Sequence, residues 1–185
     1  MFAGCSSLIK FELIGTGPLS TLENGKALVR DNTELVAYPS VSGSIVMNTI
    51  TSISVTAFEN CSNLTEVYFQ EATNVLQWAF DSCTNLTKVN FPAATDIGMY
   101  AFMNCTSLIE ASFPVVTKID GGIFGFSPSY CTSLTKVTLV PISDANFSDY
   151  YPLGNLRDVY FGVGGGAGTY TTANPGDNPS WTKKN

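Results

Sequence analysis

The stretch that decides the fold is Phe58-Glu59-Asn60-Cys61-Ser62-Asn63-Leu64-Thr65-Glu66-Val67-Tyr68-Phe69. Its pattern, Phe-x-x-Cys-x-x-Leu-x-x-Val-x-Phe, returns 22 residues later at residues 80–91. Further copies occupy residues 102–113, with Ala in the Val position, and residues 124–139, with four extra residues before the Cys. The pattern also opens the chain at residues 2–13, and its second half alone returns at residues 156–161. A fixed period of this length is typical of solenoid proteins.

The unit predicts one short strand and one tight turn. Val67 and Phe69 are two residues apart, so on a strand both side chains point to the same face, toward the core. Phe58 and Cys61 are three residues apart, which fits one helical turn. An aliphatic residue also stands five positions before the first Phe of each copy: Ile53, Val75, Ile97 and Ile119. Stacked repeats, each adding a strand about 4.8 Å from the last, would give every position a column in the core.

These residues resemble the BspA-type leucine-rich repeat, whose unit reads roughly as Ala-Phe, a Cys, a Leu and a strand ending in Phe-Pro or Leu-Pro. The match is close over residues 97–108 and specific across residues 49–140. It departs from the family pattern before Cys131 and in the last copy, where Leu153 stands in the Cys position. The resemblance implies a leucine-rich-repeat solenoid of the α/β repeat class, mostly β with short helical turns. We therefore expect about six repeats and one parallel sheet.

Two segments do not follow the period. In residues 14–52, Asn24-Gly25 is a turn signal, and the polar run Arg30 to Glu34 separates two apolar runs. This predicts an antiparallel β-hairpin inserted in the array. Residues 162–185 are rich in Gly and polar residues and predict an irregular C-terminal segment, in which Tyr170 or Trp181 covers the last repeat.

The whole chain, residues 1–185, is predicted to be a single solenoid domain, since its length is ordinary for one core. Ala57, Ala79 and Ala101 precede the first Phe of their copies, and Met1 stands in that position in the opening copy. We expect the chain to be a fragment of a longer protein.

Composition excludes several classes of function. The chain has 9 Lys and Arg against 15 Asp and Glu, a net charge of −6, so it has no basic surface for nucleic acid. It has no His, which removes the commonest general base and metal ligand. No run of 18 apolar residues occurs, so no membrane insertion is expected. The sequence therefore predicts that the protein is not an enzyme and that it has no cofactor and no metal site.

All Cys residues stand in one repeat position: Cys5, Cys61, Cys83, Cys105 and Cys131. A single interior column of Cys could form disulfides or hold a metal. A buried Cys more often acts as a small apolar side chain, and stacked repeats need no bridge, so we expect free buried thiols.

Two rows of side chains are predicted on the outer face of the sheet. The first row alternates in charge along successive strands: Glu66, Lys88, Glu110, Lys136 and Asp158, with Lys10 in the opening copy. Each opposite-charge pair contributes about 0.2 to 1 kcal/mol. The row is interpreted either as a structural ladder that sets the stacking order or as a polar binding face.

The second row holds Tyr68, Asn90, Ser112, Thr138 and Tyr160, with Glu12 in the opening copy. Aromatic rings beside small polar groups could stack on a sugar or hold a peptide strand. Alternatively, Tyr and Thr are present because they suit strands. These two rows are the candidate binding face.

The family resemblance implies a surface or secreted protein of host-associated bacteria or protists with a role in adhesion. The predicted function is a non-catalytic interaction or adhesion module of an exported bacterial surface protein, with the export signal expected to be upstream or removed. Its expected partner is a host or bacterial surface protein or a glycan, bound through the sheet face. The alternative is a passive structural spacer with no ligand of its own.

Overall fold

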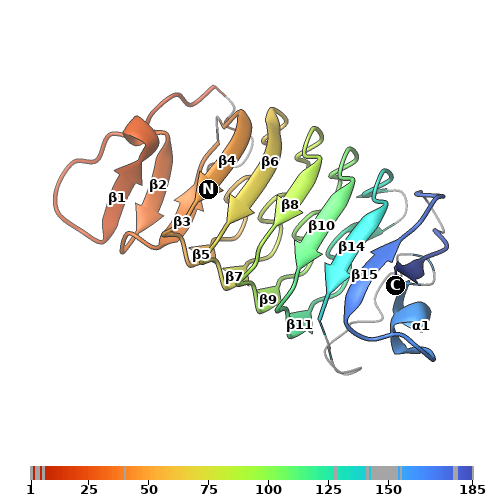
Figure 1. The fold of residues 1–185 in the computed structure, drawn as a ribbon. Coiled ribbons are helices and arrows are strands. Elements are labelled where there is room, and N and C mark those ends of the chain that lie inside the picture. Colours follow the sequence, from red (N-terminus) through yellow and green to blue (C-terminus); the bar gives the residue numbers. More distant parts are fainter. Residues whose placement is uncertain are drawn as a thin grey trace.

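The computed structural model describes residues 2, 5, 7–39, 41–126, 129–140, 142, 154, 156–176 and 179–184. Successive turns of the chain lie side by side along one axis, from the N-terminal end of the stack to the C-terminal end (Figure 1). The predicted solenoid is confirmed, and it consists mostly of strands with very little helix.

Two parallel stacks of strands run along the solenoid, where the sequence predicted one. The main sheet contains β4 (Gly43–Met47), β6 (Leu64–Phe69), β8 (Lys88–Asn90), β10 (Glu110–Phe113), β14 (Lys136–Leu139), β15 (Gly168–Thr171) and β16 (Thr182–Lys184). The narrow sheet contains β1 (Leu19–Leu22), β2 (Ala27–Arg30), β3 (Glu34–Ala37), β5 (Ser52–Ile53), β7 (Asn74–Val75), β9 (Asp96–Ile97) and β11 (Lys118–Ile119). The narrow sheet was missed because its repeating strands are two residues long, too short for the alternation that marks a strand.

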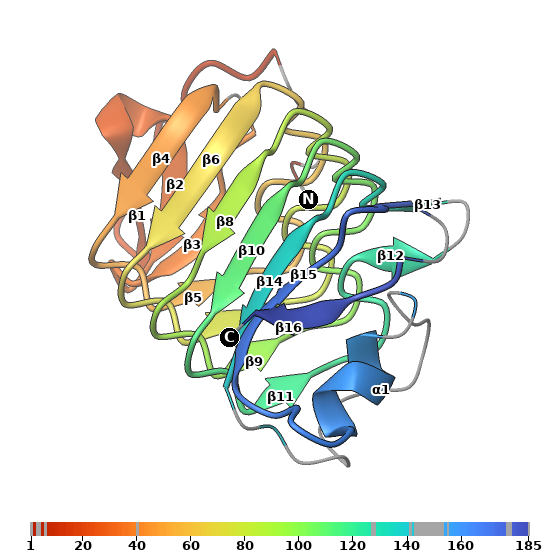
Figure 2. The ribbon, with the colours of Figure 1, turned by 45° about the vertical axis from the view of Figure 1, so that its right-hand side comes forward.

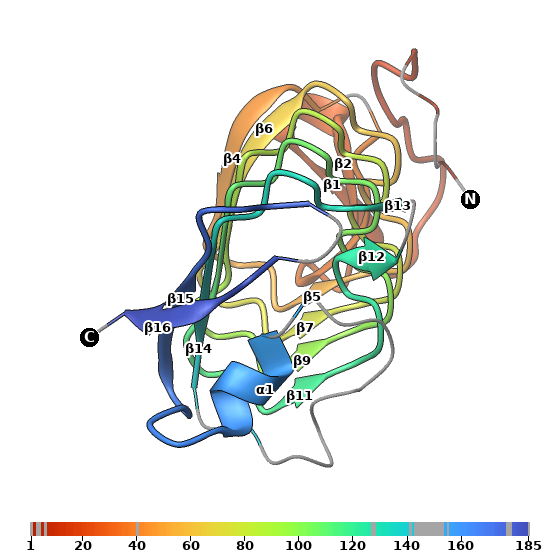
Figure 3. The ribbon, with the colours of Figure 1, turned by 90° about the vertical axis from the view of Figure 1, so that its right-hand side faces the viewer.

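Viewed along the stack, the main sheet forms one wall and the narrow sheet a second wall (Figure 3). The turns with the Phe-x-x-Cys segments close the remaining side. A two-stranded ribbon, β12 (Gly125–Phe126) and β13 (Ser129–Tyr130), accommodates the extra residues before Cys131. The core fills the space between these walls.

Two columns of Phe rings fill that core. The first runs through Phe58, Phe80, Phe102 and Phe124, with successive ring centroids 4.7, 5.3 and 6.1 Å apart. The second runs through Phe69, Phe91 and Phe113, with centroids 5.6 and 6.2 Å apart. All of these side chains are buried. Stacked rings at these distances add attraction beyond the area they bury, so the columns join each repeat to the next.

The Phe-x-x-Cys segments form turns rather than helix. Cys61 N donates to Phe58 O at 3.0 Å, the expected bond between residues three apart. The residue before Cys61, Cys83 and Cys105 is left-handed, with φ of 61° at Asn60, 60° at Ser82 and 56° at Asn104. A left-handed residue ends a right-handed helix, and Asn is among the residues that adopt this conformation most readily. The expected helical turns are therefore single turns.

The predicted hairpin is present as β2 and β3, which pair antiparallel. The hairpin was expected to be inserted in the array, but one of its strands belongs to the stack. β3 pairs in parallel with β5 and places Leu35 beside Ile53. Tyr38 then takes the Phe position, since its ring lies 6.1 Å from that of Phe58 and its N donates to Ala57 O at 2.9 Å. The chain continues into β4, the first strand of the main sheet. Residues 35–47 thus form a degenerate repeat.

The opening copy of the pattern is not part of the stack. None of the described residues between 2 and 14 lies in a strand. Cys5 is exposed, and Phe11 packs edge-on against Phe2 with ring centroids 5.0 Å apart. The place beside β6 belongs to β4. The expectation that Cys5 lies in the interior column was wrong.

The last copy of the pattern was also assigned wrongly. Residues 156–161 form the short helix α1 (Leu156–Phe161) rather than a strand. Leu156, Val159 and Tyr160 stand at i, i+3 and i+4, a spacing that suits one helix face. Leu153, expected in the Cys position, lies outside the described residues.

The C-terminal segment contains more regular structure than expected. β15 pairs antiparallel with β14, and β16 pairs antiparallel with β15. Tyr170 and Trp181 are buried against the last repeat, as the sequence suggested. β15, β16 and α1 lie together at the C-terminal end of the stack (Figure 2). This hairpin and helix cap the hydrophobic core.

Candidate binding surfaces on the two sheets

The main sheet aligns most of the predicted charged row. Glu66 pairs in register with Lys88, Lys88 with Glu110, and Glu110 with Lys136. We call these four residues the charged row. Parallel in-register pairing places residues of one repeat position directly side by side, which is why the period predicted this alignment correctly.

The charged row is only partly an ion-pair ladder. Glu110 contacts Lys136 at 2.6 Å and Lys88 at 3.9 Å, and its side chain is 26% exposed. Within the described part of the chain, no ion pair joins Glu66 to Lys88, although they are neighbours in register. Glu110 is therefore held between two cations, while Glu66 remains exposed to solvent.

The ends of the charged row differ from the prediction. Asp158 lies exposed on α1, away from the strands, and Thr171 of β15 stands beside Lys136. At the other end Ser44 of β4 stands beside Glu66, and Lys10 pairs locally with Glu12 at 2.9 Å. Both ends of the row differ from the prediction for the same reason: β4 lies next to β6, and β15 lies next to β14.

The second predicted row keeps Tyr68, Asn90, Ser112 and Thr138, aligned in register and half-buried. We call these four residues the polar row. Tyr160 is not among them, because it is buried within the C-terminal cap. Its hydroxyl accepts from Ile142 N at 2.6 Å and donates to Val140 O. The face therefore carries one tyrosine.

The other Cys residues form the expected interior column of free, buried thiols: Cys61, Cys83, Cys105 and Cys131. Burial raises the pKa of Cys61, Cys83 and Cys105 well above the usual range, so these thiols stay protonated and unreactive. Among the residues that the structure describes, no three His, Cys, Asp or Glu side chains come close enough to hold a metal ion.

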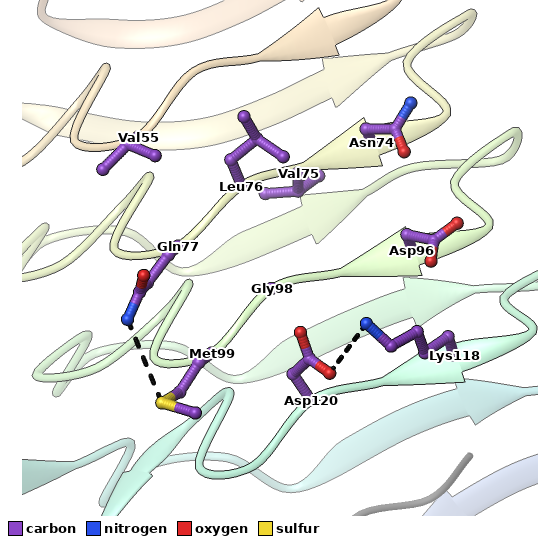
Figure 4. A pocket seen from close by; sticks show the side chains of 10 residues that line it. All are labelled: Val55, Asn74, Val75, Leu76, Gln77, Asp96, Gly98, Met99, Lys118 and Asp120. Carbon is purple, nitrogen blue, oxygen red and sulfur yellow. Dashed lines mark hydrogen bonds and ion pairs between the residues drawn. The ribbon is translucent and has the colours of Figure 1, made fainter.

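The sequence analysis missed a pocket on the outer face of the narrow sheet. Its volume is about 440 Å³. It is lined by Val55, Asn74, Val75, Leu76, Gln77, Asp96, Gly98, Met99, Lys118 and Asp120 (Figure 4). We call it the Gly98 pocket. The signal in the sequence was Gly98 itself, which stands where the neighbouring repeats carry Leu76 and Asp120.

Gly98 is required by the close approach of the backbone. A Cβ at this position would lie 2.8 Å from Gln77 N and 3.0 Å from the carbonyl carbon of Leu76. No side chain fits there without moving the preceding repeat. The middle of the row from Leu76 to Asp120 is therefore an open notch (Figure 4).

The polar side chains around the notch are held by local contacts. Asn74 Nδ2 donates to Thr73 Oγ1 at 2.9 Å, and Thr95 Oγ1 donates to Asp96 Oδ2 at 2.9 Å. Lys118 pairs with Asp120 at 3.0 Å, and the hydrogen bond and charge of Asp120 raise the pKa of Lys118. These groups form a partly ordered polar rim.

An aromatic pair lies next to this pocket. The rings of Trp78 and Tyr100 stack with centroids 6.1 Å apart and an angle of 25° between their planes. Each residue directly follows a residue of the pocket wall, and each has a positive φ, 54° and 59°. Thr56 and Gly122 hold the same repeat position with φ of 58° and 64°. Large side chains rarely adopt this conformation.

In the described part of the chain, no helix is both long and apolar enough to cross a membrane.

Comparison with known proteins gives a family model and similar structures. The model described as "BspA type Leucine rich repeat region" matches residues 37–152 in six copies. No curated protein matches the chain. A leucine-rich repeat protein from Bacteroides ovatus is 28% identical over 60% of this chain and 30% of that chain, with a TM-score of 0.48. The leucine-rich repeat protein of T. pallidum is 19% identical over 64% of this chain and 66% of that chain, with a TM-score of 0.39. The chain thus spans less than a third of the Bacteroides ovatus protein.

Proposed function

Because the chain belongs to the BspA-type leucine-rich repeat family, we propose that it is a non-catalytic interaction module that binds a surface protein through the main sheet. Repeat solenoids present extended, rigid faces, and such faces are common binding surfaces. The module belongs to an exported, surface-associated protein, as is typical of this family. Binding is inferred by analogy with the family and from the side chains on the outer face of the main sheet.

The observation that carries the proposal is the arrangement of the outer face of β6, β8, β10 and β14. The charged row and the polar row run side by side across four parallel strands. Tyr68 stands at one end of the polar row, next to the exposed Val46 of β4. An ordered backbone that presents Tyr, amide, hydroxyl and charged groups loses little entropy when a partner binds.

The alternative is a passive spacer, and one contact favours it. Glu110 is already paired with two lysines, so part of the charged row is satisfied within the chain. A surface whose charges pair internally has less to offer a partner than one with free charges.

Binding of the immobilised chain to a panel of purified extracellular matrix proteins, with a glycan panel in parallel, distinguishes the two proposals. The module predicts a matrix-protein signal that falls when Tyr68 and Asn90 are both changed to Ala. Thr132→Ala, an exposed change in a turn away from the strands, is the matched control and keeps the signal. Silence on the protein panel supports the spacer. A signal that the double variant leaves intact would contradict both the spacer and binding through the main sheet.

A further inference from the structure

We propose that the Gly98 pocket is a second binding site, which takes one neutral hexose ring of a glycan. The site lies on the narrow sheet and shares no residue with the charged row or the polar row. The inference therefore does not depend on what the main sheet binds.

The first argument is shape. Leu76, Gly98 and Asp120 directly follow three successive strands, β7, β9 and β11. Leu76 and Asp120 are therefore about 9.6 Å apart, two strand spacings. Between them the glycine leaves the backbone bare, and the backbone contacts of Gly98 prevent any other residue from filling the gap. The pocket, about 440 Å³ in volume, has room for a single six-membered ring.

The second argument is the mixture of chemistry in the walls. Three side chains supply exposed apolar surface: Val55 at 47%, Leu76 at 37% and Met99 at 38%. On the other side of the pocket, Asn74 and Asp96 offer amide and carboxylate oxygens as acceptors (Figure 4). Gln77 lies beside Met99, where its Nε2 donates to Met99 Sδ at 3.9 Å. A sugar ring has the matching character, because its hydroxyls donate and accept while its C–H groups are apolar. Few convergent polar groups over an apolar floor are typical of small-molecule sites.

The third argument is charge. Lys118 and Asp120 form an ion pair within the pocket and have no net charge together. Asp96 leaves the pocket with a net negative charge, so an anionic ligand would be repelled, whereas a cationic ligand would be attracted and is the competitor that the test below includes. A neutral hydroxylated ligand satisfies the carboxylates without an opposing charge.

The fourth argument is the aromatic pair. Trp78 and Tyr100 hold a left-handed conformation that Gly122 adopts without strain in the same repeat position. Bulky residues in such a conformation cost free energy, and they cluster at functional sites. The stacked rings lie beside Gln77 and Met99 and offer a platform for a second ring of the same glycan.

The test uses the full chain with glucose, galactose, mannose and N-acetylglucosamine as separate probes. Saturation-transfer NMR detects weak binding, and backbone amide shifts locate it. We expect at least one of these sugars to give saturation transfer and to shift the amides of Gly98, Gln77 and Trp78. The indole N–H of Trp78 should shift as well.

Two variants remove different parts of the site. Asp96→Ala removes an acceptor, and Trp78→Gly removes the aromatic platform while keeping the left-handed backbone, as Gly122 does. We expect each to weaken binding of the sugar by about tenfold or more. Asn90→Ala, a half-buried change on the main sheet, is the control and leaves sugar binding unchanged. The amide spectrum of each variant shows whether it is folded.

Three results would overturn the proposal. One is the absence of saturation transfer from all four sugars, and another is sugar binding that both folded variants retain. The third is an amide shift pattern at Gly98 produced by Nα-acetyl-lysine amide but by none of the sugars, which would indicate a site for a basic side chain. Loss of matrix-protein binding in the Tyr68 and Asn90 double variant bears only on the main sheet.

Discussion

The Sγ of Cys105 donates a hydrogen bond to the carbonyl oxygen of Phe80 in the preceding repeat, at 3.1 Å. Cys83 does the same to Phe58 at 3.1 Å, and Cys131 to Phe102 at 3.1 Å. The Cys column and the first Phe column are thus connected from repeat to repeat. A Cys suits this position because it is small and apolar and can still satisfy a buried carbonyl oxygen.

The first prediction concerns thiol reactivity. In the native protein, iodoacetamide should modify Cys5 quickly, because it is exposed, and Cys61, Cys83, Cys105 and Cys131 only after unfolding. Burial blocks the reagent at all four, and it raises the pKa of Cys61, Cys83 and Cys105, whose thiolate is the reactive form. Peptide mass spectrometry with and without urea measures the modification. Rapid modification of Cys83 or Cys105 in the native state would contradict the buried column.

The second prediction concerns the Phe columns. Phe80→Ala should lower the free energy of unfolding by about 3 to 5 kcal/mol, because it leaves a cavity between two stacked rings. Asn90→Ala, on the outer face, should change it by less than about 0.5 kcal/mol. Urea denaturation followed by circular dichroism measures both. Equal losses in the two variants would argue against the inward and outward assignments.

The third prediction concerns the charged row. A double-mutant cycle of Glu110→Gln with Lys136→Gln should give a coupling energy of about 0.2 to 1 kcal/mol. The cycle of Glu110→Gln with Lys88→Gln should give less, because that pair is separated by 3.9 Å rather than 2.6 Å.

The same row makes an exchange of Lys88 and Glu110 unfavourable. The exchange would place two glutamates side by side at 66 and 88, and two lysines at 110 and 136. The exchange should therefore lower the free energy of unfolding. Full stability in the exchanged variant would mean that the row contributes nothing to stacking.

The fourth prediction tests the place of Tyr160. Tyr160→Phe should lower the free energy of unfolding by about 1 to 3 kcal/mol, because it leaves Ile142 N and Val140 O buried without their partner. A tyrosine on an open sheet face would lose almost nothing from the same change, and Tyr68→Phe provides that comparison. Similar small effects at the two positions would contradict the buried cap.

The fifth prediction concerns pH. Burial raises the pKa of Asp81 above its ordinary value, and burial together with the charge of Asp81 raises that of Glu59. An acid whose pKa is higher in the folded state binds more protons there, so stability falls as pH rises through the interval between the two values.

Asp81→Asn should make the loss of stability above about pH 4, the ordinary pKa of a carboxyl group, shallower, since it removes one raised carboxyl and the charge acting on the other. The asparagine can still accept from Ser82 Oγ and Asn104 Nδ2, which donate to Asp81 at 3.1 and 3.2 Å. Glu71→Gln, an exposed change, is the control. Denaturation at several pH values measures the slope, and an unchanged slope in Asp81→Asn would be the contrary result.

The parts of the fold that the sequence predicted are those in which one residue type recurs at one spacing. Phe80, Cys83 and Val89 could be placed because each has counterparts 22 residues away, and in-register stacking turns that spacing into a column. Tyr38 could not be recognised, because its repeat is shorter and has Tyr in place of Phe. Residues 156–161 were wrongly predicted to be a strand, because Leu-x-x-Val-Tyr fits the spacing of a helix as well as that of a strand.

Of the candidate sites, too, the sequence predicted only the one built from a recurring repeat position. Glu66, Lys88, Glu110 and Lys136 share a repeat position and were placed together correctly. The Gly98 pocket has no such signal, because different residue types stand in its repeat positions across four successive turns, and one of those positions holds a glycine. A period identifies what repeats, whereas this pocket exists where the repeat is interrupted.

The sequence by itself determined the solenoid, its core columns and the in-register rows on the main sheet. When repeats of fixed length stack, only the in-register arrangement buries all of their apolar residues. The sequence also excluded chemistry that depends on His. Tertiary structure decided which segments extend the main sheet beyond the regular repeats, namely β4 next to β6 and β15 next to β14. The edge of a strand can pair with any backbone of suitable geometry, whatever its side chains. Tertiary structure also decided the depth of the Gly98 notch, which follows from how closely two backbones approach.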